Sequence, residues 1–510
     1  MNVLSLNKES CNCNKNKIDQ TCTPYFDALK KYIDSDVTTF HVPGHCQGQG
    51  AHEKFRDFVR QYGLEADVSQ VLELDDILQP SSVVLQAQEL AAKAYGADQT
   101  FFLINGSSSG NHAMILTALN PGDKILLPRN VHRSTTGALI LSGAFPVYME
   151  PEYDHEMQVD HTVTPETLER SLNEHPDVKA VLLLSPTYYG AACDIKRMVE
   201  IIHKYDKPAL VDEAWGPHFH FHPDLPDSAT SAGADIVVNS THKLAGSMTQ
   251  ASMLHCQGNR IDRGRLASVI RLFLSTSPSC LMVASLDVAR MNLAVNGEKL
   301  LSRALELAEK AREEINKVEG LRAFGYELVG RPGVHSFDGT KLTVTARDLD
   351  FTGYEIELIL RKRYNLQFEM SELFNCLALI TMAHTEQDIQ KIIEAFRDVK
   401  SWDREHHSMS KVKLFYQRKH RPVELPDWPR QMMTPREAFV APFEIVPLKE
   451  SAGRICNEMI TPYPPGIPIL RPGDEITEQI IDYIILEMSA GVHMQGPMDP
   501  NLNTIRVVRQ

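Results

Sequence analysis

Residues 180–211, AVLLLSPTYYGAACDIKRMVEIIHKYDKPALV, hold two short apolar runs with a helical pattern between them. The runs Ala180–Ser185 and Ala209–Val211 lack polar alternation, which is typical of strands buried on both faces of a sheet. Between them, the apolar residues of Ile195–Tyr205 recur at helical spacing. A strand, a helix and a second strand in this order predict a βαβ unit.

The same alternation runs from about Ala91 to Lys243. Further apolar runs, each expected to be a strand, are Thr100–Ile104, Lys124–Pro128, Phe145–Met149 and Ile236–Asn239. A helix is expected near Thr164, because Pro165 suits the first helical position and Glu166 the first turn. The expected fold class is therefore α/β, with a mainly parallel sheet and helices on both of its faces.

Two smaller units follow this large one. Leu300–Val318 predicts a long amphipathic helix leading out of the large domain. Strand-like and helix-like runs then mix over residues 321–400, which predicts a smaller α+β domain. Beyond a polar connector, Thr434-Pro435-Arg436-Glu437 has the form of a capping box. A last helix is expected from Thr477 to Gly491, so the C-terminal unit also reads as α+β.

Composition excludes several classes of protein. In 510 residues, 43% are apolar and 23% charged, which is ordinary for globular chains. The net charge of -14 argues against a nucleic-acid binder. No apolar run approaches the ~20 residues that span a bilayer, and the first twenty residues are polar. Nine cysteines suit reduced thiols better than a disulfide framework, so we expect a cytoplasmic protein without membrane contact.

A Ser/Gly segment follows the first predicted strand of the large unit. Residues 105–110 read NGSSSG and precede a helix that is expected to start near Asn111. Glycines let a ligand approach the backbone, and hydroxyls with helix N-terminal N–H groups form an anion site that suits a phosphate. The segment is neither a P-loop nor a GxGxxG fingerprint, so it does not indicate a nucleotide. Alone, it could equally be a turn.

Three further side chains come directly after predicted strands, at the sheet edge where α/β proteins bind ligands. Asp212 follows one strand, and as a carboxylate it could hold a cationic ring nitrogen, cap a helix or be solvated. Lys243 follows another, where a partly buried amine could act as a nucleophile. His132 follows a third, where an imidazole could stack on a planar ligand, bind a metal or cap a helix.

His218, His220 and His222 alternate in the sequence, which on a strand would place them on one face. A metal site is one interpretation. Because no fourth ligand is apparent, we favour a polar strand face and expect no metal.

The combination of features is more specific than its parts. Pyridoxal phosphate needs donors for its phosphate, a stacking face for its ring, an acid at its ring nitrogen and a lysine for its aldehyde. With these four requirements met in order, the chain resembles the fold-type-I, pyridoxal-phosphate-dependent Orn/Lys/Arg decarboxylases, in particular the compact bacterial arginine-decarboxylase-like members. The segments that carry the resemblance are 40–45 (FHVPGH), 74–76 (LDD), 128–132 (PRNVH), 186–190 (PTYYG), 211–214 (VDEA), 240–243 (STHK), 275–278 (STSP) and 463–468 (YPPGIP).

The resemblance implies roles for individual residues. Lys243 corresponds to the lysine that binds the cofactor aldehyde, Asp212 to the ring-nitrogen partner and His132 to the stacking histidine. Residues expected to hold the phosphate are Ser107, Ser108, Ser109, Ser240 and His242, and Ala214 and Trp215 are expected to contact the cofactor. Together with Lys243, His132 and Asp212, His242 is a candidate catalytic residue. At position 215 the compact members carry a histidine and the larger ones a tryptophan, so Trp215 makes the substrate contacts less certain.

The resemblance also implies an assembly. Family members are dimers with the active site at the subunit interface, so Ser275 or Thr276 is expected to reach the neighbour's phosphate. We expect a homodimer or a dimer of dimers. The implied division is a tail at 1–20, an N-terminal segment at 21–90, a cofactor-binding large domain at 91–299, a small α+β domain at 300–400, a linker at 401–433 and a C-terminal decarboxylase domain at 434–510.

The activity implied is decarboxylation of a basic L-amino acid. Arginine is favoured, giving agmatine and CO₂ for polyamine biosynthesis, with lysine and ornithine as alternatives. A fold-type-I aminotransferase or lyase, a decarboxylase of another cationic metabolite and a catalytically idle regulatory paralogue are further alternatives. Candidate acids for the distal cationic group of the substrate are Asp75, Asp76 and Glu450.

Overall fold

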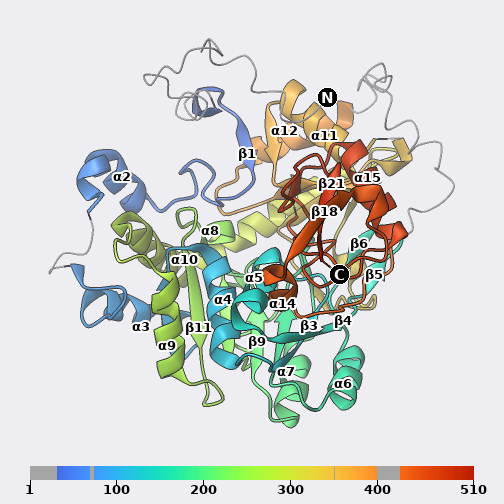
Figure 1. Cartoon of the computed structure of the whole chain (residues 1–510). Helices are drawn as coiled ribbons and strands as arrows, with labels where there is room; N and C mark the ends of the chain where they lie inside the picture. The colour runs from blue at the N-terminus through green and yellow to red at the C-terminus, as the bar shows by residue number, and fades with distance from the viewer. Residues whose placement is uncertain (1–31, 69–73, 350, 399–425, 464, 510) are drawn as a thin grey trace, which may run out of the picture.

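A seven-stranded sheet forms the centre of the large domain, with the order β2-β11-β10-β9-β7-β3-β4 (Figure 1). The computed structural model describes residues 32–68, 74–349, 351–398, 426–463 and 465–509. The sheet strands are β2 (Gln99–Leu103), β3 (Lys124–Pro128), β4 (Phe145–Met149), β7 (Ala180–Leu184), β9 (Ala209–Asp212), β10 (Ile236–Asn239) and β11 (Ser252–Cys256). Five of them, from β10 to β4, pair in parallel, and β11 is antiparallel to both of its neighbours.

The sheet confirms the α/β class expected from the sequence. Each of the six predicted strands is present to within a residue or two. Strand β11 was not predicted, because Ser252 and His255 interrupt its apolar run. Both side chains are nevertheless buried, and His255 Nδ1 lies 2.8 Å from Thr100 Oγ1 on the neighbouring strand β2.

Helices cover both faces of the sheet, and alternate strand residues serve the two layers. On one face Leu127 packs in a core with α4 (Gly106–Ala118), α5 (Arg133–Ser142) and α9 (Arg263–Phe273). On the other, Leu126 packs with α6 (Pro165–Glu174) and α7 (Ile195–Lys204). Thr164 caps α6 and Pro165 takes its first position, as predicted. The two-layer cover buries the strands and leaves only their ends accessible to a ligand.

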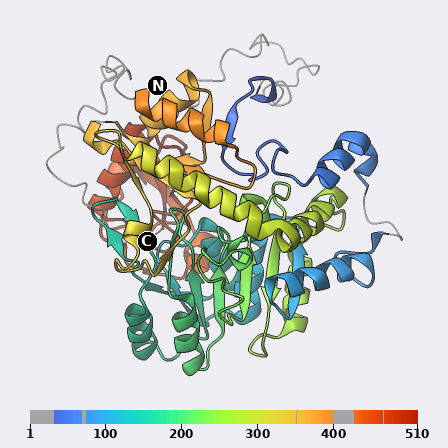
Figure 2. The ribbon, with the colours of Figure 1, turned by 180° about the vertical axis from the view of Figure 1, so that it is seen from behind.

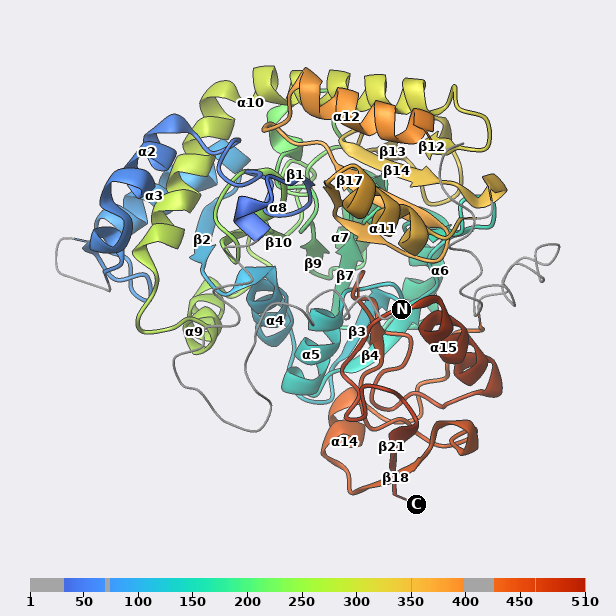
Figure 3. The same ribbon diagram turned by 90° about the horizontal axis from the view of Figure 1, so that it is seen from above.

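One long helix, α10 (Cys280–Ile315), connects the large and small domains (Figures 2 and 3). The sequence predicted a helix over Leu300–Val318, so it starts twenty residues earlier than expected and ends three residues sooner. Its N-terminal half is helical because Leu286 and Leu293 bury against the large domain, as Leu307 does further on against the small one. Among the described helices, none is long and apolar enough to cross a membrane.

The small domain is a four-stranded antiparallel sheet with helices packed on it. Its strand order is β12 (Arg322–Phe324), β14 (Lys341–Thr345), β17 (Asn375–Leu379) and β16 (Met370–Ser371), and its helices are α11 (Gly353–Arg363) and α12 (Glu386–Arg397). Near the N-terminus, β1 (Thr38–Phe40) pairs in parallel with β15 (Leu366–Phe368). The N-terminal segment is thereby fastened to the small domain.

The C-terminal unit begins with α14 (Pro435–Val440), whose capping box between Thr434 and Glu437 is present as predicted. Strands β18 (Phe443–Pro447) and β21 (Thr504–Val508) pair antiparallel, and α15 (Glu478–Ala490) is capped by Thr477 and ended by Gly491. The predicted tail at 1–20 and most of the predicted linker, up to residue 425, lie outside the described residues.

Buried charges fasten the C-terminal unit to the end of strand β3. Arg129 Nη2 donates to Asp474 Oδ2 at 2.8 Å, with both side chains at most 2% exposed. Arg471, also buried, donates from Nη2 to the Arg129 carbonyl oxygen. The Arg129 guanidinium stacks 4.3 Å from the centre of the Tyr148 ring. Asp474 is therefore ion-paired with Arg129 and also interacts electrostatically with the buried guanidinium of Arg471.

Replacing Asp474 by Asn should destabilise this junction strongly. The change keeps the shape but leaves Arg129 and Arg471 as uncompensated buried charges, which typically costs about 3 kcal/mol or more. We expect this loss in urea unfolding, with earlier proteolytic release of the C-terminal unit. Asp177→Ala is the control, because it breaks the exposed Lys124–Asp177 pair, and it should leave the midpoint nearly unchanged. An Asp474→Asn protein as stable as this control would contradict the role of the junction.

Candidate active site

The carboxyl ends of the parallel strands gather the residues that the sequence singled out. Asp212 is the last residue of β9, and Lys243 lies in the single-turn helix α8 (Thr241–Leu244) directly after β10. His132 follows β3 and caps α5. Lys243 interacts electrostatically with both Asp212 and His132. Three separate strand ends thus place a carboxylate, an amine and an imidazole in one site.

Asp212 is held rigidly in the interior. It is 2% exposed, and its Oδ2 accepts a hydrogen bond from Asn111 Nδ2 at 2.8 Å. Its Oδ1 accepts from the backbone N–H of Ala214 at 3.1 Å. Burial raises the pKa of Asp212, while Asn111 and the cationic Lys243 oppose that rise. The carboxylate is therefore oriented by neutral donors and is short of positive charge.

Lys243 is a desolvated amine lying over an aromatic face. Its Nζ is 3.8 Å from the centre of the Trp215 ring. Burial lowers the pKa of Lys243 to about 8, although the nearby carboxylates of Asp212 and Glu369 act in the opposite direction. A second lysine, Lys341, lowers it further. An amine with this pKa holds a substantial neutral, nucleophilic fraction near pH 8.

The predicted Ser/Gly loop is in fact the first turn of helix α4. The helix starts at Gly106 rather than near Asn111, so Ser107, Ser108 and Ser109 are helical. Gly106 has a positive φ of 73°, which allows the chain to turn sharply from β2 into the helix. Ser109 Oγ donates to the Gly106 carbonyl, while Ser107 and Ser108 remain partly accessible at the helix N-terminus.

Ser240 joins this helix N-terminus to the Lys243 segment. Its Oγ donates to Ser107 Oγ at 2.6 Å, although 133 residues separate the two in sequence. Next to it, Thr241 Oγ1 is buried without a hydrogen-bond partner in the described part of the chain. Helix N–H groups and several hydroxyls therefore converge beside Lys243, as an anion site requires.

His132 is a neutral imidazole in this site. Its Nδ1 accepts from the backbone N–H of Ser134 at 3.2 Å and lies 2.7 Å from Ser134 Oγ. Burial and the cationic Lys243 lower the pKa of His132 to about 3. Gly466 of the C-terminal unit lies against the ring, where a Cβ would come within 3.2 Å of it, and the Gly466 carbonyl accepts from the N–H of Arg133.

His242 and the N-terminal segment hold the backbone at Lys243 in place. The Nδ1 of His242 donates to the carbonyl of Ala251 at 3.0 Å, and burial lowers the pKa of His242 to about 4. Gly44 donates its N–H to the His242 carbonyl at 2.9 Å. A Cβ on Gly44 would lie 2.3 Å from the carbonyl oxygen of Lys243, so only glycine fits this approach.

Ser275 and Thr276 are the predicted site residues that the single chain does not bring to Lys243. They follow α9 and are exposed. The expectation that they complete the site of a neighbouring subunit stays a prediction.

Sequence reasoning missed a buried charged pair behind Trp215. Lys341 Nζ donates to Asp338 Oδ2 at 2.6 Å, both side chains are fully buried, and His218 Nε2 lies 3.4 Å from Asp338. The expected strand through His218, His220 and His222 is wrong, because Phe219–Phe221 forms a 3-10 turn that separates the three rings. No local signal marks this contact, since Asp338 is 120 residues from His218.

Glu369 is a second residue that the sequence did not single out. Its Oε2 accepts from the backbone N–H of Val42 at 2.7 Å, and it interacts electrostatically with Lys243 and Lys341. Burial raises the pKa of Glu369, and His41 and the two lysines oppose this. Glu369 therefore brings a second carboxylate to the amine, from the small domain.

The candidate acids for a substrate's distal charge lie elsewhere in the single chain. Asp75 accepts backbone N–H groups of Asp76, Ser81, Ser82 and Val84, and these contacts lower its pKa. Asp76 accepts from the N–H of Leu78. Glu450 is an exposed residue of the 3-10 turn Leu448–Glu450. Asp75 thus serves to shape the turn before α3 (Val83–Tyr95).

Comparison with known proteins agrees with this geometry. The chain matches the family described as "Orn/Lys/Arg decarboxylase, major domain" over residues 23–388, and the C-terminal domain of that family over residues 421–497. An arginine decarboxylase of Bacillus subtilis (strain 168) is 42% identical, covering 96% of this chain and 98% of that protein. An arginine decarboxylase of Bacillus anthracis is 40% identical, covering 97% and 99% respectively.

Solved structures show the same fold. The constitutive lysine decarboxylase of Escherichia coli superposes with a TM-score of 0.73 at 21% identity, over 96% of this chain and 82% of that one. The Sphingomonas wittichii serine palmitoyltransferase superposes with a TM-score of 0.56 at 16% identity, over 72% and 87%. The fold-type-I class expected from the sequence is thus confirmed. With its major and C-terminal domains both matched, the chain belongs to the Orn/Lys/Arg decarboxylase family.

Proposed function

We propose that the chain decarboxylates a basic L-amino acid with pyridoxal phosphate as cofactor, and that it prefers L-arginine, giving agmatine and CO₂. The observation that carries the proposal is the pairing of a buried carboxylate, Asp212, with a desolvated amine, Lys243, at the ends of neighbouring parallel strands. The relatives named arginine decarboxylase, at 40–42% identity over most of the chain, support arginine as the substrate.

The residues present fit this cofactor. The N-terminal turn of α4 and Ser240 offer N–H and hydroxyl donors for a phosphate. The buried Thr241 hydroxyl has no hydrogen-bond partner among the described residues and could donate to the same group. Asp212 lacks a full counter-charge and would receive one from a protonated ring nitrogen. When bound, pyridoxal phosphate supplies an aldehyde that combines with amines and a ring that accepts the electron pair left by departing CO₂.

Each residue then has a defined task. Lys243 would provide the amine to which the cofactor's aldehyde attaches when no substrate is bound. Asp212, fixed by Asn111 and by the Ala214 N–H, would keep the ring nitrogen protonated. His132 is uncharged and offers the face of its ring for stacking.

His242 acts as an orienting group. A carbonyl can only accept, so the contact with Ala251 places the proton on Nδ1 and leaves Nε2 with a lone pair. Because the pKa of His242 is lowered to about 4, the ring is neutral at pH 7 and is a poor proton donor. His242 fixes the backbone turn from which Lys243 projects and offers Nε2 as an acceptor.

Glu369 is the acid best placed to favour a cationic substrate. It lies close enough to Lys243 to shift the pKa of that amine. Burial raises the pKa of Glu369, so a further cation beside it would stabilise its charged form. A guanidinium brought to it would gain a carboxylate partner in a site of low polarity. We assign the enzyme to the cytoplasm and to polyamine biosynthesis, as a homodimer or dimer of dimers.

Release of CO₂ from the three basic amino acids tests the substrate. With the cofactor supplied, we expect kcat/KM for arginine to exceed that for lysine and for ornithine by about tenfold or more, since a planar two-point carboxylate contact discriminates a guanidinium. Mass spectrometry should identify agmatine. The Lys243→Ala enzyme is the control for background release. A higher kcat/KM for lysine or ornithine would refute the arginine assignment and leave decarboxylation standing.

The nucleophile is tested by the pH dependence of amine labelling. In the cofactor-free chain, acylation of Lys243 should rise as pH increases and reach half its maximal rate near pH 8, because the neutral amine reacts. A free lysine would need a pH of about 10.4. Exposed Lys449 is the internal control for the reagent. After cofactor addition, borohydride should fix a chromophore on the Lys243 peptide, and a chromophore on another lysine would overturn the assignment.

The shared site is tested by mixing two inactive proteins. One carries Lys243→Ala and the other Ser275→Ala with Thr276→Ala. If each site takes these residues from different chains, every mixed dimer holds one intact site, so equal mixing should restore about a quarter of wild-type activity. Subunit exchange is verified with mass-labelled chains. Exchange without recovered activity would show that each site is built from one chain.

A further inference from the structure

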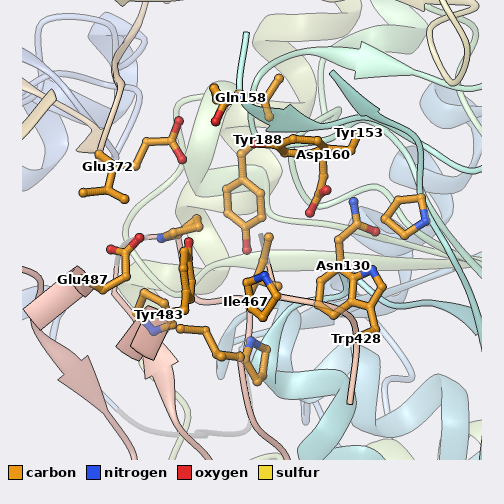
Figure 4. A pocket seen from close by; sticks show the side chains of 18 of the residues that line it. Asn130, Tyr153, Gln158, Asp160, Tyr188, Glu372, Trp428, Ile467, Tyr483 and Glu487 are labelled. Atoms are coloured by element: carbon orange, nitrogen blue, oxygen red, sulfur yellow. The ribbon is translucent and has the colours of Figure 1, made fainter. Parts of the chain in front are cut away.

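A cavity of about 680 Å³ lies where the large, small and C-terminal domains meet (Figure 4). The large domain contributes Asp160 and Tyr188, the small domain Glu372, and the C-terminal unit Ile467 and Glu487. His132, Asp212 and Lys243 are absent from its lining among the described residues. Tyr188 forms the shared wall, since its ring lies 5.6 Å from that of Trp215. The cavity therefore adjoins the catalytic site without including it.

Five carboxylates of the described residues line this cavity, and burial raises the pKa of three of them, Asp160, Glu372 and Glu487. Glu372 accepts from Asn375 Nδ2 at 2.5 Å and from the hydroxyl of Tyr189. Glu487 is 5% exposed and accepts from the hydroxyls of Tyr354 and Tyr483. Figure 4 shows the carboxylate of Asp160 and the hydroxyl of Tyr188 directed into the open space. In the described part of the chain, no lysine or arginine lines the cavity.

Neutral acceptors on the same walls also lack partners. Asn130 Oδ1, Gln158 Oε1 and Thr187 Oγ1 belong to lining residues that are 5% exposed or less. None of these oxygens has a hydrogen bond within the described structure. Buried polar atoms are almost always paired, so each of these oxygens needs a donor that the described residues do not supply, which a water molecule or a ligand N–H can be.

The arrangement does not suit a single metal ion. The acids come from three domains, and the described residues contain no group of three His, Cys, Asp or Glu side chains that could hold a metal. Each of these carboxylates would therefore be neutralised by a separate cationic group along an extended ligand. Between them the walls are aromatic and aliphatic, with Trp428, Ile467 and Ile480, which suits methylene groups and cation–π contacts.

The partners already present favour ammonium over guanidinium groups. Glu372 and Glu487 each have contacts to hydroxyl or amide donors, which occupy part of their acceptor capacity. A planar guanidinium prefers a free two-point carboxylate, whereas an ammonium needs a single point charge. We propose that this three-domain cavity is a binding site for an elongated aliphatic oligoamine, separate from the catalytic site.

The raised pKa values of its three buried acids decide how many protons the cavity holds when no ligand is bound. Burial raises the pKa of Asp160 to about 7 and that of Glu487 to about 7. Burial, with repulsion from these two, raises the pKa of Glu372 to about 8. The other titratable groups lining the cavity are Glu150, Tyr153, His155, Tyr188, Tyr189, Tyr354, Asp427 and Tyr483. An arriving ammonium favours the ionised carboxylates, so binding near pH 7 must release protons, and affinity must fall as pH decreases below 6.

Calorimetry with spermidine tests the site. The holoenzyme is first treated with borohydride, so that its lysine-bound cofactor no longer exchanges with amines. We expect one spermidine per chain, with an enthalpy that varies with buffer ionisation as roughly two protons are released near pH 7. The diol 1,8-octanediol has a similar length and no charge, and it should bind at least tenfold more weakly. Equal binding of the diol would overturn the role of the carboxylates.

Variants locate the binding. Glu372→Gln with Glu487→Gln should weaken spermidine binding tenfold or more and reduce proton release to the part that Asp160 contributes. Glu478→Gln removes an exposed acid from the same helix, α15, and should change the affinity less than twofold. Unchanged affinity in the double variant would overturn the proposal. So would spermidine binding that the borohydride treatment abolishes, because the amine would then occupy the catalytic site.

Two readouts keep these outcomes distinct from failures of folding or of the proposed activity. Thermal unfolding of each variant shows whether it is folded, and the proton release and pH dependence are measured on the unmutated chain. CO₂ release from arginine is measured separately, so an inactive enzyme that binds spermidine would refute the decarboxylase proposal alone. A wild-type chain that binds spermidine with no proton release near pH 7 would refute the assignment to these acids.

Discussion

The buried pairing of Arg129 with Asp474 is the contact on which the arrangement of the domains depends. Arg129 directly follows β3, and three residues later His132 caps helix α5. Because Asp474 and Arg471 both bind Arg129, the C-terminal unit is fixed at the strand end and not merely packed against the surface. Gly466 can then lie against His132. The junction therefore sets the position of one wall of the candidate active site and one wall of the neighbouring cavity.

Two buried amines lie against the ring of Trp215. Lys243 Nζ lies 3.8 Å from its ring centre and Lys341 Nζ lies 5.5 Å away. Lys341 is neutralised by Asp338 at 2.6 Å, and the lysine, together with His218, lowers the pKa of that carboxyl. Lys243 has no carboxylate at such a distance among the described residues. Burial lowers the pKa of both lysines, but only Lys341 has a contact ion pair that opposes this and holds its amine in place.

Local signals in the sequence were enough to predict the strands of the sheet and the residues at their ends. Asp212, Lys243 and His132 were found because each directly follows an apolar run, and the chain order fixes the edge at which such residues meet. The start of α4 at Gly106 was misjudged because Ser and Gly are poor helix formers in isolation. Here the turn is stabilised by Ser109 and by the contact of Ser107 with Ser240.

Contacts across long sequence separations gave no such signal. Lys341 reads as a surface residue of a strand until Trp215, 126 residues away in sequence, packs against it. Glu369 is an ordinary strand-end acid until Val42 and Lys243 approach it. The acids of the three-domain cavity are each unremarkable in their own segments. Their shared property, a lack of cationic partners, exists only after the domains have been brought together.

The position of Tyr188 connects the two sites physically. Its hydroxyl points into the cavity while its ring packs beside Trp215, on which the amine of Lys243 lies. Burial and the charge of Asp212 raise the pKa of Tyr188, so it stays a neutral hydroxyl that can accept from an ammonium. A ligand that fixes this hydroxyl restrains the Tyr188 ring, and the ring in turn restrains Trp215. The cavity and the candidate active site therefore share one aromatic wall, which runs from the Tyr188 hydroxyl through the ring of Trp215 to the amine of Lys243.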